Sequence, residues 1–466
     1  MSIIEAIKQP KADIFRRIFI KRRSQITGLY EEDWLDVTSD VKSFGKVKQD
    51  IDSVRLYQFS FSNMKVTFEN DSGRYNPSTS DFSLWNGFLN QQRTLVKVEI
   101  GFITRYQRDD GFWVNKEYQG AVLWDEASWD SEDEWDFEES PIVFTGIISG
   151  DIPLSDKDEV TFTIKPLTSV FDDFPAVELT GWTSTGMTAS QFMGMLRDQQ
   201  DGNGNYIFRG FFGDTVANWD ISATSSVYSQ LNTSGAEGVY DKTVWEVIQT
   251  LSEAENYVPY ITPDGHFKFV SREANQTATV YQFHGAGSFN NEYGQTIKQV
   301  TSYGQKISKY YSRVEVKFKD TSTSDSTVYV SSAYEVTPSS NPFVLGHRTL
   351  SIQNYFIPNT ASALVIANQV FDDYSALKNE IEFKTSLVPH LNIFDRIALY
   401  YDPTEPGENS LWDLNNWAGD DTSTSQDLTW DSSPGDAIIL EGQEFKFLSM
   451  EIDIDNLECR FVAREV

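Results

Sequence analysis

The sequence predicts a mainly β protein, with two antiparallel β domains and a smaller α+β unit between them. Three observations support this prediction. The chain has 466 residues, more than one hydrophobic core usually holds, so two or three domains are expected. Aromatic residues make up 14 % of it, and they favour the half-buried surface of a sheet. Short stretches of alternating apolar and polar residues recur along the chain, for example on both sides of the loop within 143–166.

The first β domain is expected at 33–176. Between Phe59 and Phe68, apolar residues fall at close to every second position, with one irregularity near Asn63. A turn-forming stretch rich in Asn, Ser, Gly and Pro follows, and the alternation resumes at 93–102. Because a period of two is that of a strand, the region is expected to form one antiparallel β domain.

The α+β unit is expected at 177–272. Apolar residues at helical spacing predict helices within 188–200 and 241–257, and Thr243 with Glu246 fits a capping box at the start of the second helix. A hairpin follows directly, and its Asp-Gly pair is suited to a tight turn with positive φ.

The second β domain is expected at 273–466, with one helix at 360–379. Apolar residues between Ala361 and Leu377 recur every three or four positions in this helix. Such an amphipathic stripe is typical of a helix that docks on a sheet. Further alternating segments on both sides of the helix supply the strands of the domain.

Two segments, 124–140 and 402–436, interrupt this pattern by interleaving Trp with acidic residues where a hairpin loop should be. Their similarity fits either a distant duplication of the two β domains or independent drift to the same composition. We expect both insertions to fold back on their domain or to contact a neighbouring subunit, with the indoles buried; the alternative is a disordered acidic loop. The candidate contact residues are Trp124, Trp129, Trp135, Trp412, Trp417 and Trp430.

The charge of the chain argues against polyanionic partners. It has 38 basic and 69 acidic residues, a formal net charge of −31 at pH 7. Nucleic acid and anionic membrane surfaces are therefore poor candidates. High net charge also keeps an assembly-prone subunit soluble, which is an alternative explanation of the same number.

The single cysteine, Cys459, excludes an intramolecular disulfide and fits synthesis in a reducing compartment. In an apparent terminal strand it is expected to pack rather than to act as a nucleophile. The N-terminal arm, 1–32, lacks the apolar core and cleavage site of a signal peptide, and no run of residues approaches a membrane span. The chain is expected to be made in the cytoplasm.

A glycosidase is the first enzyme class to consider, because it needs two carboxylates of unequal pKa beside aromatic platforms. The insertions carry such carboxylates, but they lie in polar runs where nothing in the sequence raises one pKa selectively. The residues concerned are Asp125, Asp130, Asp136, Asp413 and Asp431.

No other catalytic, cofactor-binding or metal-binding pattern is predicted. The segment 201–205 resembles the start of an EF-hand loop, but Tyr206 stands in place of the turn glycine and Phe212 in place of the bidentate Glu. Neither a GxSxG motif, a phosphate-binding loop nor a dinucleotide fingerprint occurs. The four histidines are scattered without metal-ligand spacing: His266, His284, His347 and His390.

Four stretches carry a resemblance to a known family. They are "VTFENDSGRYNP" and "FTGIISG" in the first β domain, "TVWEVIQTLSEAENYVPYITPDGHFKF" in the α+β unit, and "ASALVIANQVFDDYSALKNEIEFKTSLVPHLNIFDRIAL" in the second β domain. In this order they resemble the opening domain, the central helix and hairpin, and the helix and strands of the second barrel in the hub proteins of long-tailed bacteriophage tails and baseplates. The similarity covers most of the chain but is one of pattern and order, and it departs at the two Trp/acidic insertions.

The resemblance implies a structural virion protein with two β-barrel-like hub domains. Because no catalytic pattern is found in the sequence, we expect no enzymatic activity. A homotrimer of such subunits would present a pseudo-sixfold ring at the tail tip, matching the tail tube on one side and the tip or fibres on the other. The implied partners are further copies of the chain, tail tube or distal tail proteins, the tape measure protein, and tail tip or fibre proteins. Its acidity would let DNA pass during ejection without adhering.

Two other functions stay open. A carbohydrate-binding or host-recognition module would use Trp residues of the insertions as stacking platforms. An enzyme that cuts cell-wall polymer is the third hypothesis. A hub should form a trimer or larger ring, whereas a binding module could remain a monomer.

Overall fold

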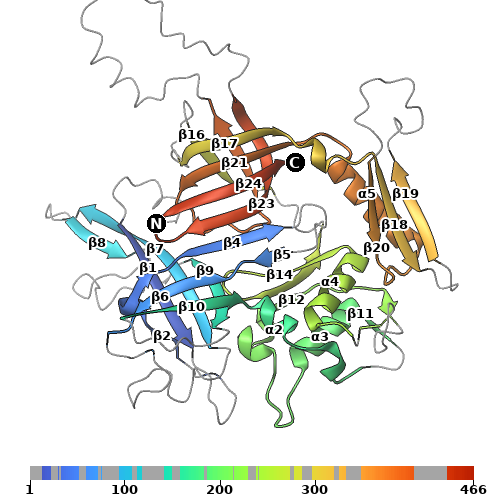
Figure 1. Cartoon of the computed structure of the whole chain (residues 1–466), viewed down its shortest axis with the longest axis horizontal. Helices are drawn as coiled ribbons and strands as arrows, with labels where there is room; N and C mark the ends of the chain where they lie inside the picture. The colour runs from blue at the N-terminus through green and yellow to red at the C-terminus, as the bar shows by residue number, and fades with distance from the viewer. Residues whose placement is uncertain are drawn as a thin grey trace, which may run out of the picture.

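The computed structural model describes most of the chain, and every structural statement below concerns the described residues. These are 13–21, 30, 33–51, 59–71, 75, 94–107, 113–117, 141–148, 158–182, 186–213, 215–228, 238–239, 241–272, 278–285, 296–319, 325–331, 348–402 and 438–466. The mainly β fold class is confirmed, with two large curled sheets and a smaller part that carries most of the helices (Figure 1). Within these ranges no helix has the length and apolar character needed to span a membrane.

The first large sheet joins strands in the order β2-β1-β7-β9-β10-β6-β3, with β8 paired to the end of β7. Neighbouring strands are antiparallel. Their bounds are β1 (Asp13–Lys21), β2 (Leu35–Asp36), β3 (Val41–Ser43), β6 (Met64–Glu69), β7 (Leu95–Gln107), β8 (Trp113–Glu117), β9 (Ile142–Ile148) and β10 (Glu159–Pro166).

The two edges of this sheet meet, because β2 and β3 follow each other in the chain. Only Val37 and the 3-10 turn Thr38–Asp40 separate them. The Val37 amide donates to the Ile18 carbonyl oxygen at 3.1 Å, and the Ile18 amide donates to the Thr38 hydroxyl at 3.0 Å. The sheet therefore curls on itself, which leaves few free edges, and we call it the first barrel.

The second large sheet has the order β16-β22-β23-β24-β21-β17. Its edge strands also meet, since the Thr296 amide next to β17 donates to the His284 carbonyl oxygen in β16 at 2.9 Å. We call it the second barrel. Its strands are β16 (Thr279–Gly285), β17 (Ile297–Gln305), β21 (Asn379–Ser386), β22 (Arg396–Tyr401), β23 (Leu440–Asp453) and β24 (Glu458–Glu465).

The two barrels share one strand order. If β2 and β3 are counted as one strand, the first barrel has the order β1-β7-β9-β10-β6-β2/β3, and the second has the order β16-β22-β23-β24-β21-β17. In both barrels these are the first, fourth, fifth, sixth, third and second strands along the chain. One difference separates them: β1 runs antiparallel to β7, whereas β16 runs parallel to β22. The barrels thus have matching topology with the first strand reversed.

A bent hairpin joins the two barrels. Strand β4 (Lys46–Ile51) continues from β3, and β5 (Phe59–Phe61) leads into β6. The inner part of the hairpin, β3 with β6, belongs to the first barrel, whereas β4 pairs both with β5 and with the C-terminal part of β23 (Figure 1). The irregularity predicted near Asn63 lies at the break between β5 and β6.

Gly45 stands at the bend between β3 and β4. Its φ is +71°, and a Cβ there would lie 2.4 Å from the carbonyl oxygen of Lys65. Both the left-handed conformation and the close approach of the opposite strand require a glycine at this position. Because of this bend, β3 pairs with β6 in the first barrel and β4 pairs with β23 of the second barrel.

One hydrophobic cluster runs through both barrels. It includes Ile18 and Phe144 in the first barrel, Val47 in the hairpin, and Phe447 and Phe461 in the second barrel. A continuous apolar interior resists separation of the barrels, because parting them would expose buried apolar surface to water.

The α+β unit packs its helices on small sheets. Its elements are α2 (Thr168–Asp172), β11 (Met187–Thr188), α3 (Ala189–Asp198), β12 (Trp219–Ile221), β13 (Val227–Tyr228), α4 (Val244–Glu255), β14 (Tyr257–Ile261) and β15 (Phe267–Ser271). The capping box is confirmed: the Glu246 amide donates to the Thr243 hydroxyl at 3.2 Å, and the Thr243 amide donates to the Glu246 carboxylate at 2.9 Å. Gly265 in the predicted turn has φ +86°.

A three-stranded sheet in the order β19-β18-β20 carries the helix α5. The bounds are β18 (Arg313–Lys319), β19 (Asp325–Ser331), β20 (Thr349–Gln353) and α5 (Thr360–Tyr374). Buried residues of α5, such as Ile366 and Val370, belong to the same hydrophobic cluster as Val314 of β18 and Leu251 of α4. The helix therefore docks on a sheet, and this sheet packs with the α+β unit.

The predicted division of the chain into domains stays a prediction. Three elements, β1, β4 and α5, make contacts across its predicted boundaries. Residues 13–21, predicted to belong to the N-terminal arm, form β1 of the first barrel. The hairpin strand β4 pairs with β23, and α5 shares a hydrophobic cluster with α4. Pairing between segments so distant in the chain leaves no mark on local periodicity.

Candidate functional site

The residues predicted for contact or catalysis lie mostly outside the described part of the chain. This holds for Trp124, Trp129, Trp135, Trp412, Trp417 and Trp430, and equally for Asp125, Asp130, Asp136, Asp413 and Asp431. Their predicted roles therefore stay predictions.

The segment that resembles an EF-hand start forms a compact turn. The Asp201 carboxylate accepts hydrogen bonds from the backbone amides of Asn203 at 2.8 Å and Asn205 at 2.9 Å. Among the described residues, no group of three or more His, Cys, Asp or Glu side chains is placed to hold a metal ion.

Burial raises the pKa of Cys459 to about 12, which keeps its thiol protonated.

A first site of interest is the seam between the barrels, where Asp455 meets the hairpin bend. Asp455 lies in the turn between β23 and β24, and its carboxylate accepts hydrogen bonds from the Phe44 amide at 2.9 Å, the Gly45 amide at 2.9 Å and the Ser43 hydroxyl at 2.7 Å. The Ile454 amide donates to the Gly45 carbonyl oxygen at 3.1 Å. The β23–β24 turn of the second barrel is thus bound to the bend at Gly45, where the hairpin leaves the first barrel.

Charged side chains extend this seam. Burial alone would raise the pKa of Asp455, but the hydrogen bonds from Phe44, Ser43 and Gly45, together with nearby Arg16, outweigh it and lower that pKa. Lys46 Nζ lies 2.9 Å from Asp453 Oδ2 and 3.2 Å from Glu451 Oε1. The seam is therefore polar at its surface and apolar beneath.

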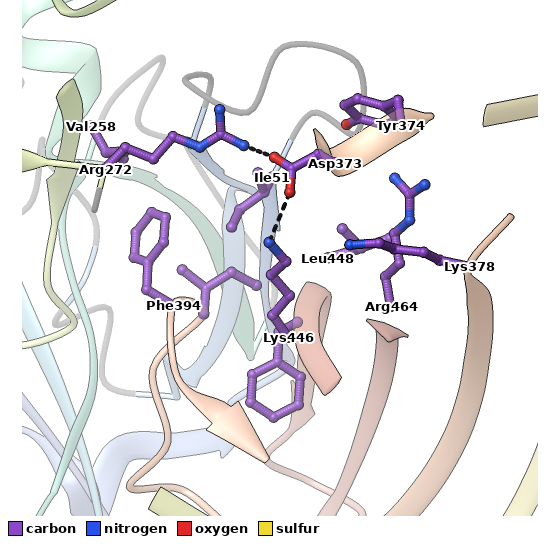
Figure 2. A pocket seen from close by; sticks show the side chains of 12 residues that line it. Ile51, Val258, Arg272, Asp373, Tyr374, Lys378, Phe394, Lys446, Leu448 and Arg464 are labelled. Atoms are coloured by element: carbon purple, nitrogen blue, oxygen red, sulfur yellow. Dashed lines mark hydrogen bonds and ion pairs between the residues drawn. The ribbon is translucent and has the colours of Figure 1, made fainter. Parts of the chain in front are cut away.

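A second site is a pocket enclosed by the second barrel, the hairpin, the α+β unit and α5 (Figure 2). We call it the basic pocket, because four of its lining side chains are cationic and only one is acidic. Its charged residues are Arg272, Lys378, Lys446, Arg464 and Asp373, and the remaining lining residues are Ile51, Val258, Tyr374, Ile393, Phe394, Phe447 and Leu448.

Asp373 connects three parts of the molecule in this pocket. It lies at the C-terminal end of α5, forms an ion pair with Arg272, which directly follows β15, and lies 3.3 Å from Nζ of Lys446 in β23 (Figure 2). Arg272 is 8 % exposed, so the pair is largely shielded from water. Cations near the end of a helix also interact favourably with its dipole.

Burial and repulsion from neighbouring cations lower the pKa values of the two lysines of the basic pocket. Burial, followed by repulsion from Lys446 and Arg464, lowers the pKa of Lys378 to about 8. Burial, followed by repulsion from Arg272, Arg396 and Arg464, lowers the pKa of Lys446 to about 8. The pocket therefore concentrates positive charge in a strongly acidic chain.

Sequence reasoning missed both sites. The charged residues of the basic pocket come from three stretches that are far apart in the chain, at 272, 373–378 and 446–464, and none lies in a motif with fixed spacing. Asp455 could have been recognised as a turn residue from "DIDNLE", but nothing local shows that the hairpin bend lies against it.

Comparison with known proteins gives matches among solved structures. No protein-family model and no curated protein matches the chain. A tail protein from Neisseria meningitidis MC58 is similar with a TM-score of 0.47 and 10 % identity, covering 96 % of each chain. A prophage tail protein from Shewanella oneidensis is similar with a TM-score of 0.45 and 12 % identity, covering 97 % of this chain and 98 % of the other. A prophage tail protein from Listeria monocytogenes EGD-e is similar with a TM-score of 0.43 and 8 % identity, covering 96 % of this chain and 94 % of the other.

Proposed function

We propose that the chain is a structural subunit of a bacteriophage tail, forming a hub ring that joins the tail tube to the tail tip or fibres and lets DNA pass. The observation that carries this proposal is the pair of barrels with matching strand order in one chain. Two barrels of like topology can occupy near-equivalent positions around an axis, so three subunits can offer six similar units. The bent hairpin and the common core support it by fixing the spacing of the two barrels.

The expected partners are further copies of the chain, tail tube or distal tail proteins, the tape measure protein, and tip or fibre proteins. The net charge of −31 supports a channel that DNA crosses without binding, because like charges repel along the phosphate backbone. The expected place of the subunit is the tail tip of the virion, after synthesis in the host cytoplasm.

Light scattering coupled to size exclusion tests the assembly state. We expect the purified chain to elute with a mass of three times 53.1 kDa or a multiple of it, because each subunit supplies two of the six positions of a ring. The measurement should be repeated over a tenfold dilution series, since subunit association depends on concentration. A monomer at every concentration would favour a host-recognition module instead.

The Trp/acidic insertions are proposed to contact neighbouring subunits. Changing the three Trp residues of each insertion to Ser keeps the charge of the loops and removes their apolar area, so it should weaken assembly and shift the mass distribution towards monomer. The residues are Trp124, Trp129, Trp135, Trp412, Trp417 and Trp430. The matched control changes Asp130 and Asp413 to Asn, which keeps the indoles. Unchanged assembly in the Trp variant would show that the loops are decoration.

We infer that the chain is not an enzyme, because no nucleophile with a base and no carboxylate pair of unequal pKa is identified in its sequence. A peptidoglycan turbidity assay and a reducing-sugar assay on polysaccharide should both stay at background. Turnover that disappears in Asp130→Asn or Asp413→Asn would contradict this inference and support a cell-wall hydrolase.

A further inference from the structure

The basic pocket holds more positive than negative charge: four of its lining side chains are cationic and one is acidic, and the carboxylates of Asp372 and Glu465 also act on Lys378 from nearby. Asp373 is shared by Arg272 and Lys446. Lys378 and Arg464 have no ion pair with a carboxylate in the described part of the chain. In a chain with 69 acidic residues, such an excess of cations marks a site that an anion can enter.

The burial and the unused hydrogen-bond donor of Arg464 are a second observation that points to a ligand. This arginine is 5 % exposed, its Nε has no hydrogen-bond partner among the described residues, and its guanidinium lies over the Tyr374 ring at 4.6 Å from the centroid. A buried guanidinium with an unused donor is costly, because burial removes the hydrogen bond that water would supply. An oxyanion in the pocket would supply the acceptor.

The rest of the lining is apolar and limits the kind of anion. Ile51 of the hairpin, Val258 of the α+β unit, and Ile393, Phe394 and Leu448 of the second barrel form the other walls. Figure 2 shows Lys378 and Arg464 on one side of the pocket, Phe394 on the other, and Lys446 between them. A fully hydrated inorganic ion would gain nothing from these walls, whereas an organic acid would bury its apolar part against them.

We propose that the basic pocket binds a small organic carboxylate, with the carboxylate between Lys378, Lys446 and Arg464 and the apolar body against Phe394 and its neighbours. The ligand would touch the hairpin, the α+β unit and the second barrel at once. Its binding would therefore tighten the junction of these parts. This proposal does not depend on the role in a tail.

Isothermal titration with benzoate tests the proposal on the purified full-length chain at pH 7 and low ionic strength. We expect saturable binding of benzoate, weaker binding of acetate, which lacks the apolar body, and none of benzamide, which lacks the charge. Lys378→Met should weaken benzoate binding about tenfold, the loss expected for one charge-assisted contact. The control Lys384→Met removes the same charge from β21 outside the pocket and should leave the affinity unchanged.

The pH dependence gives a readout that needs no variant. The groups facing the two lysines are Asp372 and Asp373 of α5, Arg464 and Glu465 of β24, Arg272 after β15, and Arg396 of β22. Lys378 and Lys446 are protonated below a pKa of about 8, so benzoate affinity should fall as the pH rises through about 8 and beyond.

Four results would overturn the proposal: no heat of binding with benzoate, equal binding of benzamide, equal losses in Lys378→Met and Lys384→Met, or an affinity that does not fall at high pH. If inorganic phosphate binds as tightly as benzoate, the proposed contact between an apolar ligand body and Phe394 is wrong, and the pocket binds a free oxyanion instead.

Discussion

Replacing Asp455 by Ala should lower the free energy of unfolding by about 2 kcal/mol, because three hydrogen bonds that hold the hairpin bend disappear together. The side chain is 36 % exposed, so water replaces part of what is lost, and the figure is set below the sum of three buried bonds. Urea denaturation followed by circular dichroism measures the change. Asp71→Ala, in an exposed turn, is the matched control and should cost far less.

Acidification gives a second test of the same carboxylate. Because the pKa of Asp455 is lowered in the folded protein, its contribution to stability is present above its ordinary unfolded value and is lost as the pH falls through the folded pKa. Wild type should therefore lose more stability than Asp455→Asn on acidification below about pH 4. Equal losses in both proteins, or equal costs of Asp455→Ala and Asp71→Ala, would show that the seam does not depend on Asp455.

Replacing Asp373 by Leu should have the largest effect of any single change discussed for this chain, about 3 kcal/mol in the free energy of unfolding. The substitution leaves the cations of the basic pocket without the carboxylate that Arg272 and Lys446 share, in a place where burial and mutual repulsion already disfavour their charge. Thermal and urea denaturation should both report the loss. The neighbouring Asp372 is exposed, so Asp372→Asn serves as the control and should change stability little.

A compensating variant separates electrostatics from packing. Adding Lys446→Met to Asp373→Leu removes one of the stranded charges and should recover part of the stability, because apolar replacement of both members of an ion pair is often close to neutral. If the double variant is as unstable as Asp373→Leu alone, the loss comes from packing at the end of α5 and the ion pairs are not what joins the three parts.

Much of the local structure was predictable from the sequence. The alternation between Phe59 and Phe68 predicted strands and placed their break near Asn63, and the capping pair Thr243 and Glu246 fixed the start of α4. These features depend on residues within a few positions of each other, where periodicity and capping chemistry are informative. The strand β1, nine residues long, was missed because it lies in the basic stretch that was assigned to the N-terminal arm.

The sites could not be predicted in the same way. Asp455 meets Gly45 across a sequence separation of 410 residues, and the basic pocket gathers Arg272, Asp373 and Lys446 from different elements. Which strand pairs with which depends on how a barrel closes, and local composition does not encode that choice. The equal strand order of the two barrels likewise emerges only when the pairings are known.

Electron cryo-microscopy of the purified oligomer is the most direct test of the central claim, that the two barrels of each chain are equivalent building blocks of a ring. The claim predicts a threefold ring in which first and second barrels alternate around one circumference, with the hairpin strand β4 at each junction within a subunit. A particle without rotational symmetry, or a ring built from only one of the two barrels with the other projecting from it, would contradict the claim.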